Sequence, residues 1–337
     1  MKNIVYIGNK WNKKRNANFT SIDLLEPLFI DCGYKVFSAS DKENIFLRMT
    51  NMLWMCFNYR NKADYVLIDT YGTLNFYYAY FVSQFCRILK LKYMPILHGG
   101  KLPMRLKNSP ILSRAIFKNA FINIAPSMYT KSNFEALGFN NIICIPNSIE
   151  LKNYPFKKRV FNDVRLLWVR SFSRIYNPLL AIKILKALKD ESINSRLCMV
   201  GPDGDGSLKA AKKYADQLGI EVNFTGKLSK QEWIKLSEDY NIFINTTNFD
   251  NMPISVIEAM ALGLPVVSTN VGGMPFLIEN NKNGVLVEPD SVEAFVKSIN
   301  NMVSFTQNTT ILTQEARTCI ENLDWKVVKK QWINVLK

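Results

Sequence analysis

The most informative part of the sequence runs Asn245-Thr-Thr-Asn-Phe-Asp-Asn-Met-Pro-Ile-Ser-Val-Ile-Glu258-Ala-Met-Ala-Leu-Gly-Leu-Pro265. An apolar run ends at Asn245, a polar loop follows, and helical spacing begins near Pro253, a residue that suits a first helical turn. Glu258 stands in this helix among Val, Ile, Ala and Met, so its carboxylate is expected to face away from bulk water.

A buried carboxylate such as that of Glu258 needs hydrogen-bond donors. Two vicinal ribose hydroxyls would supply them for both oxygens, and the free amides at the helix start would bind a phosphate or sugar oxygen. The alternative is that Glu258 pairs with a Lys or Arg that only stabilises the fold. The motif around Glu258 favours the nucleotide.

The alternation of strand and helix extends outward from this segment in both directions, which is typical of βαβ units in a parallel sheet. Strands are predicted at 3–7, 34–38, 65–69, 93–97, 121–125, 142–145, 165–169, 196–200, 222–225, 242–245, 265–268 and 284–287. Helices are predicted at 45–59, 178–189, 207–218, 230–238, 253–262 and 291–302. We therefore expect an α/β protein with two doubly wound domains, which bind ligands in a cleft at the carboxyl ends of their strands.

The length of 337 residues exceeds the usual size of one domain. The polar, basic segment 152–163 is typical of a hinge. It predicts an N-terminal domain at 1–155, a C-terminal domain at 156–320 and a final helix at 321–337 that packs back on the first domain. The sequence offers neither an eighteen-residue apolar run nor a signal-peptide core after Met1, which predicts a cytoplasmic protein.

Composition limits the chemistry. His98 is the single histidine, and the six cysteines are scattered without a Cys-x-x-Cys pair, so a multi-histidine metal centre or a disulfide framework is not expected. The net charge of +15 is uneven: residues 1–155 hold 20 Lys plus Arg against 9 Asp plus Glu, and residues 156–337 hold 23 against 19. A basic N-terminal half suits phosphates, an anionic membrane surface or nucleic acid, or it only keeps the surface solvated.

A family resemblance is carried by the residues around Glu258. Asp250 and Glu258, separated by seven residues and followed by Ala-Met-Ala-Leu-Gly-Leu-Pro, resemble the E-x7-E element of the retaining glycosyltransferases of family 4, with Asp for the first Glu. The similarity continues through the glycine turn 271–275 and the strand 283–287, and Phe224-Thr225-Gly226 resembles the base-pocket segment of that family. The resemblance is specific within the C-terminal half and mainly architectural before it.

This resemblance implies the GT-B fold, in which two Rossmann-like doubly wound domains face each other across a cleft. The nucleotide-sugar donor would lie on the C-terminal domain and the acceptor on the N-terminal one. By position, Glu258 holds ribose hydroxyls and Asp250 the hydroxyls of the transferred sugar, whose identity or pose is altered by the shorter acid. The donor-binding residues implied are Glu258, Asn251, Met252, Pro253, Ile254, Gly201, Thr225 and Gly226.

A second departure from the family concerns the cations that bind the diphosphate. Where the family has an Arg and, five residues later, a Lys, this sequence has Ser171 and Tyr176. Arg170 and Arg174 lie one and two positions away, and a departing nucleoside diphosphate needs positive charge. We expect at least one of the two arginines to replace the missing pair. The alternative is a degenerate site in which both only coat a loop.

His98 ends a predicted strand and precedes two glycines, which permit a close approach of the backbone to a ligand. The resemblance implies that His98 touches the donor sugar beside the reacting carbon; the alternative is a packed core histidine. Basic and amide residues of the first loop suit an acceptor phosphate, as in a lipid diphosphate, or are merely solvated. The residues predicted on this acceptor or phosphate side are Gly8, Lys10, Lys13, Arg15, Gly99, Gly100 and Lys101.

Two further segments allow more than one interpretation. Asp203-Gly-Asp205 resembles the metal-binding D-x-D of another glycosyltransferase fold, but its glycine-rich surroundings favour a turn, and no metal is expected. The wide apolar face of 45–59 favours a core helix, with contact to a membrane surface as the alternative.

The combined prediction is a retaining, metal-independent glycosyltransferase of bacterial surface polysaccharide biosynthesis, in the cytoplasm or peripheral on the inner face of the membrane. Its expected partners are a UDP- or GDP-sugar, a glycan or polyprenyl-diphosphate-linked acceptor and an anionic membrane surface, without nucleic acid. One alternative is an epimerase of the same fold that acts on a nucleotide sugar. The other is a catalytically degenerate protein that binds sugar nucleotides or nucleic acid.

Overall fold

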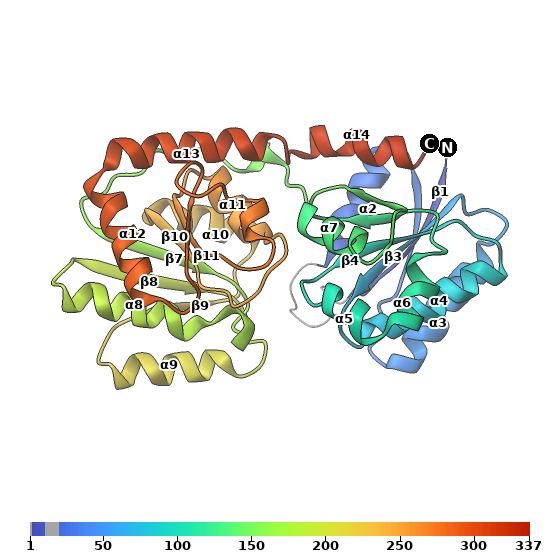
Figure 1. The fold of residues 1–337 in the computed structure, drawn as a ribbon, viewed down its shortest axis with the longest axis horizontal. Coiled ribbons are helices and arrows are strands. Elements are labelled where there is room, and N and C mark those ends of the chain that lie inside the picture. Colours follow the sequence, from blue (N-terminus) through green and yellow to red (C-terminus); the bar gives the residue numbers. More distant parts are fainter. Residues whose placement is uncertain (1, 11–19) are drawn as a thin grey trace. The chain divides into compact units, whose positions relative to one another are not determined.

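The computed structural model describes residues 2–10 and 20–337. Contacts between Cα atoms divide the chain into two units, one formed by residues up to Pro146 with Leu336 and Lys337, and one formed by Asn147 to Val335. Each unit is a parallel sheet covered by helices (Figure 1).

In the first unit six parallel strands stand in the order β2-β1-β3-β4-β5-β6. The strands are β1 (Asn3–Ile7), β2 (Lys35–Ala39), β3 (Tyr65–Tyr71), β4 (Tyr93–His98), β5 (Asn123–Ala125) and β6 (Ile142–Cys144). The helices are α2 (Ser21–Asp31), α3 (Ile45–Asn58), α4 (Asn75–Ile88), α5 (Leu102–Asn108), α6 (Pro110–Phe117) and α7 (Met128–Glu135). The strand order reverses between β1 and β3, and a doubly wound sheet offers its ligand site at such a switch point.

In the second unit the order is β12-β11-β10-β7-β8-β9, again all parallel. The strands are β7 (Val164–Val169), β8 (Ser195–Val200), β9 (Asn223–Gly226), β10 (Ile242–Asn245), β11 (Val266–Thr269) and β12 (Val285–Val287). The helices are α8 (Pro178–Asp190), α9 (Ser207–Gln217), α10 (Lys230–Leu236), α11 (Ile254–Ala261), α12 (Val292–Ser304), α13 (Thr306–Glu321) and α14 (Trp325–Val335). This is the strand order of a dinucleotide-binding fold, with its switch point between β7 and β10.

Local sequence explains where these elements begin. The central strands are nearly continuous apolar runs, since helices cover both faces of a parallel sheet, and all of Ile4 to Ile7 is buried. Pro178 occupies the first turn of α8, where a missing amide proton costs nothing. The Ser229 hydroxyl and the Glu232 carboxylate form a reciprocal capping box at the start of α10.

All but one of the predicted strands and helices are confirmed within two residues at each end. The exception is the helix predicted at 321–337, since α13 ends at Glu321 and α14 spans Trp325–Val335. A further difference lies at the start of α11. Pro253 has extended backbone angles, φ −72° and ψ 122°, and precedes α11 as its cap instead of lying in its first turn. The left-handed turn at Gly263, with φ +74°, ends this short helix after Ala261.

The boundary between the units differs from the predicted one. Residues 147–155 belong to the second unit because Trp325 donates its amide proton to the Ile149 carbonyl at 2.8 Å, and Arg317 donates to the Tyr154 carbonyl at 2.7 Å. Helix α14 groups with the second unit, and only Leu336 and Lys337 after it group with the first, where the Tyr65 hydroxyl donates to the Lys337 carbonyl at 2.7 Å. Within the described part of the chain, every helix is too short or too polar to cross a bilayer.

Candidate functional site

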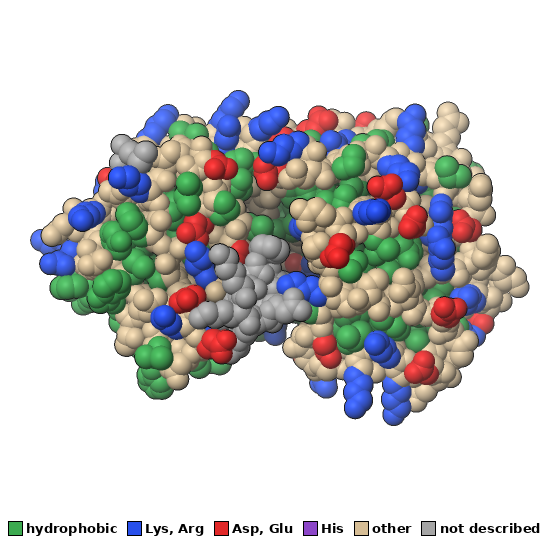
Figure 2. All heavy atoms as spheres, turned by 180° about the vertical axis from the view of Figure 1, so that it is seen from behind, with side chains coloured by type: hydrophobic (Ala, Val, Ile, Leu, Met, Phe, Trp, Pro, Cys, Tyr) green, Lys and Arg blue, Asp and Glu red, His purple; other side chains and the backbone are tan. Residues whose placement is uncertain are grey.

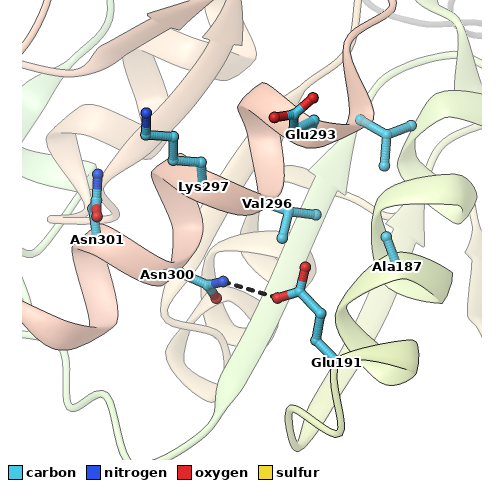
Figure 3. Close-up of a pocket in the computed structure, with 8 residues that line it drawn as sticks. Ala187, Glu191, Glu293, Val296, Lys297, Asn300 and Asn301 are labelled. Carbon is cyan, nitrogen blue, oxygen red and sulfur yellow. Dashed lines mark hydrogen bonds between the residues drawn. The ribbon is translucent and has the colours of Figure 1, made fainter.

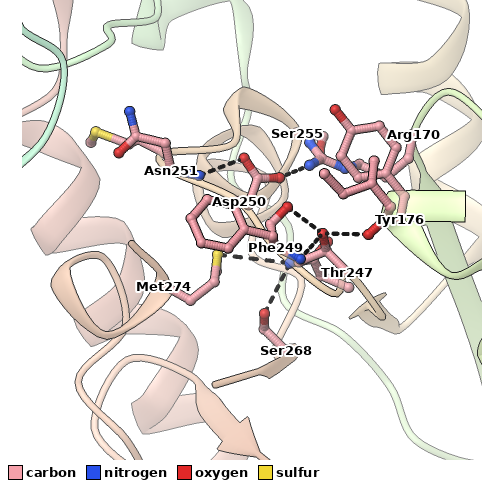
Figure 4. A network of polar contacts seen from close by, with 12 residues as sticks. Arg170, Tyr176, Thr247, Phe249, Asp250, Asn251, Ser255, Ser268 and Met274 are labelled. Carbon is pink, nitrogen blue, oxygen red and sulfur yellow. Dashed lines mark hydrogen bonds and ion pairs between the residues drawn. The ribbon is translucent and has the colours of Figure 1, made fainter. Parts of the chain in front are cut away.

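The second unit gathers predicted site residues at the switch point of its sheet. Arg170 directly follows β7, and the loop that carries Asp250 leaves the end of β10, the neighbouring strand. The Arg170 guanidinium forms an ion pair with Asp250 and lies over the Tyr176 ring, 4.1 Å from its centroid (Figure 4). It also approaches the Ser255 hydroxyl, with Nη1 and Oγ 3.4 Å apart.

Burial shapes the electrostatics of Arg170. Burial lowers the pKa of this guanidinium, and the neighbouring Tyr176 partly opposes the change. An arginine side chain nevertheless keeps its proton in proteins, so the group is a permanent cation. Its Nε is buried and has no hydrogen-bond partner within residues 2–10 and 20–337. Arg170 therefore combines a fixed positive charge with an unused donor, beside the tyrosine that stands where the family pattern has a lysine.

Two glycines allow this arrangement. A Cβ atom on Gly201, at φ +152°, would lie 1.7 Å from the Arg170 carbonyl oxygen, and a Cβ on Gly273 would lie 1.8 Å from that of Asn251. Both positions therefore exclude any other residue. The Gly201 amide donates to the Gly226 carbonyl at 2.8 Å and so joins the end of β8 to the end of β9. Thr225 is the residue of β9 before Gly226.

Glu258 lies in α11 and is 2% exposed. Its Oε1 accepts a hydrogen bond from the Tyr154 hydroxyl at 2.6 Å and forms an ion pair with the Lys230 ammonium. Burial, followed by the charge on Glu258 and this hydrogen bond, raises the pKa of Tyr154, so the phenol remains a donor. Lys230 is the first residue of α10, and its side chain is 39% exposed.

The partners of Glu258 correspond to the alternative raised from the sequence, a pairing with lysine. Ribose binding stays a prediction, and a nucleotide on this carboxylate would have to share it with the Lys230 ammonium or displace that ammonium. Displacement is feasible because Lys230 already reaches water, whereas Glu258 does not.

The loop before α11 presents the predicted backbone contacts. The Asn251 amide donates to Oδ1 of Asp250 at 2.8 Å (Figure 4). The Met252 carbonyl accepts from the Asn147 side chain at 3.0 Å, Pro253 caps α11, and Ile254 is its first residue. The loop is thus held at both ends, and it leads directly into the amides of the first helical turn.

Arg174 differs from Arg170 in its surroundings. Its side chain is exposed, and its backbone amide donates to Oδ2 of Asp205 at 3.0 Å. Asp205 also accepts from the hydroxyls of Ser207 and Ser173, and these bonds hold the pKa of its carboxyl at about 2. Oδ1 of Asp203 accepts from the Gly206 amide at 2.8 Å. The two acids therefore serve a turn that starts α9.

In the first unit, His98 ends β4 and is buried. Its Nε2 lies 2.9 Å from Oδ1 of Asp69, and its Nδ1 lies 3.3 Å from the Ser21 hydroxyl. The Tyr6 hydroxyl donates to the same Asp69 oxygen at 3.0 Å. An ionised carboxylate only accepts, so Nε2 carries the proton in this contact.

The remaining residues predicted on the acceptor or phosphate side have separate surroundings. A Cβ on Gly8 would lie 2.6 Å from Oδ2 of Asp69, so any other residue here would force the Asp69 carboxylate to shift. The Lys10 ammonium pairs with Glu26 at 2.6 Å and donates to the Ser38 hydroxyl at 2.9 Å. Gly99, Gly100 and Lys101 form the turn between β4 and α5. Lys13 and Arg15 lie outside the described residues.

Sequence reasoning missed the partners Asp69, Tyr6, Tyr154 and Lys230. Asp69 has a weak signal, since it is an acid in an otherwise apolar strand that ends beside the switch point. Tyr154 and Lys230 have none, because they stand 104 and 28 residues from Glu258 in sequence. Only the fold of the second unit brings the segment around Tyr154 and the start of α10 to the Glu258 carboxylate.

A separate cavity of about 560 Å³ lies in the second unit between α8 and α12 (Figure 3). Glu191 at the end of α8 accepts a hydrogen bond from the Asn300 side chain across it at 3.1 Å. None of the predicted site residues that the structure describes lines this cavity. Among the described residues, no group of three His, Cys, Asp or Glu side chains is placed to hold a metal ion.

Comparison with known proteins adds the family. Residues 153–318 match the family described as Glycosyl transferases group 1. The chain is 28% identical over 149 residues to the sulfoquinovosyl transferase SQD2 of Arabidopsis thaliana, covering 43% of this chain and 28% of that protein. It is 27% identical over 149 residues to the UDP-Gal:alpha-D-GlcNAc-diphosphoundecaprenol alpha-1,3-galactosyltransferase of Escherichia coli, covering 42% of this chain and 35% of that protein. The chain spans less than half the length of either relative.

A solved structure agrees over the full chain. Alr3699/HepE of Anabaena, in complex with UDP-glucose, has a TM-score of 0.80 and 16% identity, and the match covers 100% of this chain and 99% of that one. At this identity the likeness concerns the fold, and the narrower assignment to family 4 stays a prediction. Through residues 153–318 the chain belongs to the glycosyl transferases group 1, and its two doubly wound units have the GT-B fold.

Proposed function

We propose that this chain transfers a sugar from a UDP- or GDP-sugar, bound by the second unit, to a glycan or a polyprenyl-diphosphate-linked glycan with retention of configuration. The proposal rests mainly on one observation, the meeting of Arg170 and Asp250 beyond the neighbouring strands β7 and β10. A permanent cation at a switch point suits a diphosphate, and an acid beside it suits sugar hydroxyls.

In the proposed reaction, the bond between the anomeric carbon and the diphosphate oxygen breaks while the acceptor hydroxyl bonds to the same face of the sugar. The acceptor proton passes to an oxygen of the departing diphosphate, so the protein supplies no nucleophile. Arg170 and the amides before α11 stabilise the negative charge that develops, without a metal ion. Glu258 holds the ribose hydroxyls, and His98 contacts the sugar.

The names of related proteins support the donor and the acceptor classes. The similar protein of Escherichia coli uses UDP-Gal and a diphosphoundecaprenol-linked sugar, and the Anabaena protein was solved with UDP-glucose. A basic N-terminal half is consistent with a lipid-diphosphate acceptor. We accordingly place the activity in bacterial surface polysaccharide assembly, in the cytoplasm at the inner face of the membrane.

The first test measures binding. Thermal unfolding is followed with UDP, GDP, ADP and their sugar conjugates, because a ligand that binds only the folded state raises the melting temperature. We expect one nucleotide to do so, and we expect Glu258→Ala to abolish the shift. The control is Glu279→Ala, which removes a surface acid paired with Lys282. This variant should keep the rise in melting temperature. Unchanged affinity of the Glu258 variant would refute the ribose assignment.

The second test follows the reaction. Release of free nucleotide only after an acceptor is added indicates transfer, whereas interconversion of the sugar without acceptor indicates an epimerase. NMR of the product gives its anomeric configuration, and an inverted product contradicts retention. Loss of activity with EDTA contradicts metal independence. Salt-sensitive binding of random oligonucleotides, without turnover of any donor, would favour the nucleic-acid-binding alternative.

A further inference from the structure

Helices α3, α4, α5 and α6 of the first unit expose an unusual number of large apolar side chains. Helix α3 packs against α4, α4 against α6, and α6 against α5, so the four helices form one continuous layer. Phe46 and Ile111 are each 81% exposed, and Leu74 is 78% exposed. Soluble proteins rarely leave so many large apolar groups together in water.

The exposed apolar residues follow helical stripes instead of being scattered. On α4 and the residue before it, Leu74, Tyr77, Phe81 and Ile88 are exposed at a spacing that places them on one side of the helix, while Phe76, Ala79 and Val82 face the core. On α3, Phe46, Trp54 and Phe57 are exposed, while Met52 and Cys56 are buried. The core therefore takes one side of each helix and leaves a second apolar side uncovered.

The charges on the same helices are almost all positive. Between Asp69 and Glu135 the sequence contains no acid, and Asp69 itself is buried. Basic side chains of this layer are Arg60, Arg87, Arg105, Lys107, Arg114 and Lys118. Arg60 lies over the Phe57 ring at 4.0 Å and Arg105 over the Tyr77 ring at 5.8 Å, so positive and apolar groups are interleaved. Figure 2 shows hydrophobic side chains at the surface of the first unit beside Lys and Arg.

We infer that this basic apolar face, formed by the exposed side chains of α3 to α6, docks on an anionic phospholipid membrane. Apolar side chains would enter the interface while Lys and Arg contact the lipid phosphates. Charge complementarity decides against a second copy of the chain, because a symmetric dimer would place one basic face against the other. A protein partner of ordinary composition would not need both an acid-free surface and an uncovered apolar stripe.

The sequence favoured α3 as a core helix, and Met52 and Cys56 on one side of it do lie in the core. The docking surface concerns its other, exposed side. The purpose of docking rests on the proposed function, because a lipid-linked acceptor is found only at a membrane. The docking itself does not depend on catalysis, so the two can fail separately.

The experiment uses the full chain and vesicles of phosphatidylcholine with or without 30 mol% phosphatidylglycerol, analysed by sedimentation. We expect binding to the anionic vesicles that weakens with salt. The triple variant Lys107→Gln, Arg114→Gln, Lys118→Gln should bind about 100-fold more weakly, since each basic side chain near the surface contributes roughly a fivefold factor. Lys209→Gln, Lys213→Gln, Lys297→Gln on the second unit is the matched control and should bind like the unaltered protein.

The apolar half of the inference is tested separately. Leu74→Ser, Phe81→Ser, Ile88→Ser should weaken binding at least about tenfold, whereas Phe305→Ser, Ile311→Ser on exposed sites of the second unit should not. Trp54 is an exposed tryptophan of this face, so lipids brominated along their chains should quench fluorescence in the unaltered protein and much less in Trp54→Phe. Substitutions at exposed positions leave the core intact, and circular dichroism verifies the fold.

Several results would overturn the inference. They are equal binding by the patch and control variants, equal binding to both kinds of vesicle, or an unaltered protein that is a dimer and becomes a monomer in the patch variants. Tight binding of an oligonucleotide that competes with vesicles would assign the face to nucleic acid. If vesicle binding behaves as expected but no donor is turned over, the proposed function fails and the docking surface stands. If transfer to a water-soluble acceptor occurs without vesicle binding, the docking surface is refuted and the proposed function stands.

Discussion

Each unit buries one carboxylate that accepts a hydrogen bond from a tyrosine hydroxyl and contacts a basic side chain. In the second unit Glu258 accepts the hydrogen bond from Tyr154 and contacts Lys230. In the first unit Asp69 accepts it from Tyr6 and contacts His98. The basic partners differ, since the side chain of Lys230 is 39% exposed and that of His98 is 9% exposed. A flexible, partly hydrated lysine can move into water when a ligand replaces its hydrogen bond to the carboxylate, whereas a buried imidazole cannot. The second unit can therefore offer its acid to a ligand, and the first holds its histidine in one orientation.

The sharpest test of this difference removes the lysine. Among the described residues, Lys230→Met leaves the buried Glu258 carboxylate with Tyr154 as its one side-chain donor. An uncompensated buried charge lowers the free energy of unfolding by about 3–5 kcal/mol. Lys230→Met, Glu258→Gln should recover most of the loss, measured by urea unfolding. The control is Lys282→Met, whose pair with Glu279 is exposed and contributes less than about 1 kcal/mol.

The same variant also distinguishes the two interpretations of Glu258. If ribose hydroxyls replace the ammonium, the binding nucleotide should raise the melting temperature of Lys230→Met more than that of the unaltered protein. An equal or smaller shift would mean that the lysine belongs to the bound state.

The second largest effect concerns Arg170. Arg170→Ala should lower kcat about 10²–10³-fold, because a preorganised donor to the developing charge contributes about 3–4 kcal/mol. Arg174→Ala should change kcat by less than about threefold, since that side chain is exposed and only its backbone binds Asp205. Steady-state kinetics with a saturating donor measure kcat for both variants. Equal decreases in kcat would contradict the preference for Arg170.

The corresponding change in the first unit should be smaller. Asp69→Asn keeps the volume but removes the charge opposite His98, and it should cost about 1–3 kcal/mol of stability. Tyr6→Phe removes one hydrogen bond to the same oxygen and should cost about 1 kcal/mol. If His98 acts on the sugar, kcat should fall more in Asp69→Asn than in Tyr6→Phe. Equal kcat values in both variants and the unaltered protein would leave His98 a structural residue.

The smallest effect is expected at Asp205, whose pKa of about 2 lies below the ordinary value of 3.8. A lowered folded-state pKa means that the contribution to stability is complete above pH 4 and is lost as the pH falls through 2. Because this carboxylate is near the surface, Asp205→Asn should cost less than about 1 kcal/mol at pH 6. The difference from the unaltered protein should be mostly lost at pH 2, whereas the exposed Asp216→Asn should cost nothing at either pH. A constant difference would exclude ionisation as its cause.

The sequence alone determined where the strands, helix α3 and helices α8 to α12 lie along the chain, and it identified the loop between β10 and α11 as the candidate donor side. Strand and helix periods are local, and the motif from Asn245 to Pro265 is contiguous, so both can be recognised without a third dimension. The same local spacing limited the candidate cations for the diphosphate to Arg170 and Arg174. Preference for Arg170 came from its contacts with Asp250 and Tyr176, which stand on other segments.

Only the tertiary structure decided what surrounds each buried acid and which helix faces stay uncovered. Tyr154 and Lys230 reach Glu258 from distant positions, and Asp69 reaches His98 from the adjacent strand β3. Helix α3 has the same apolar composition whether its outer side packs or not, because exposure depends on what other elements leave open. Local periodicity reports that a residue is apolar or charged. Which residue contacts that side chain depends on strand order and packing. Residues far apart in the chain determine both together.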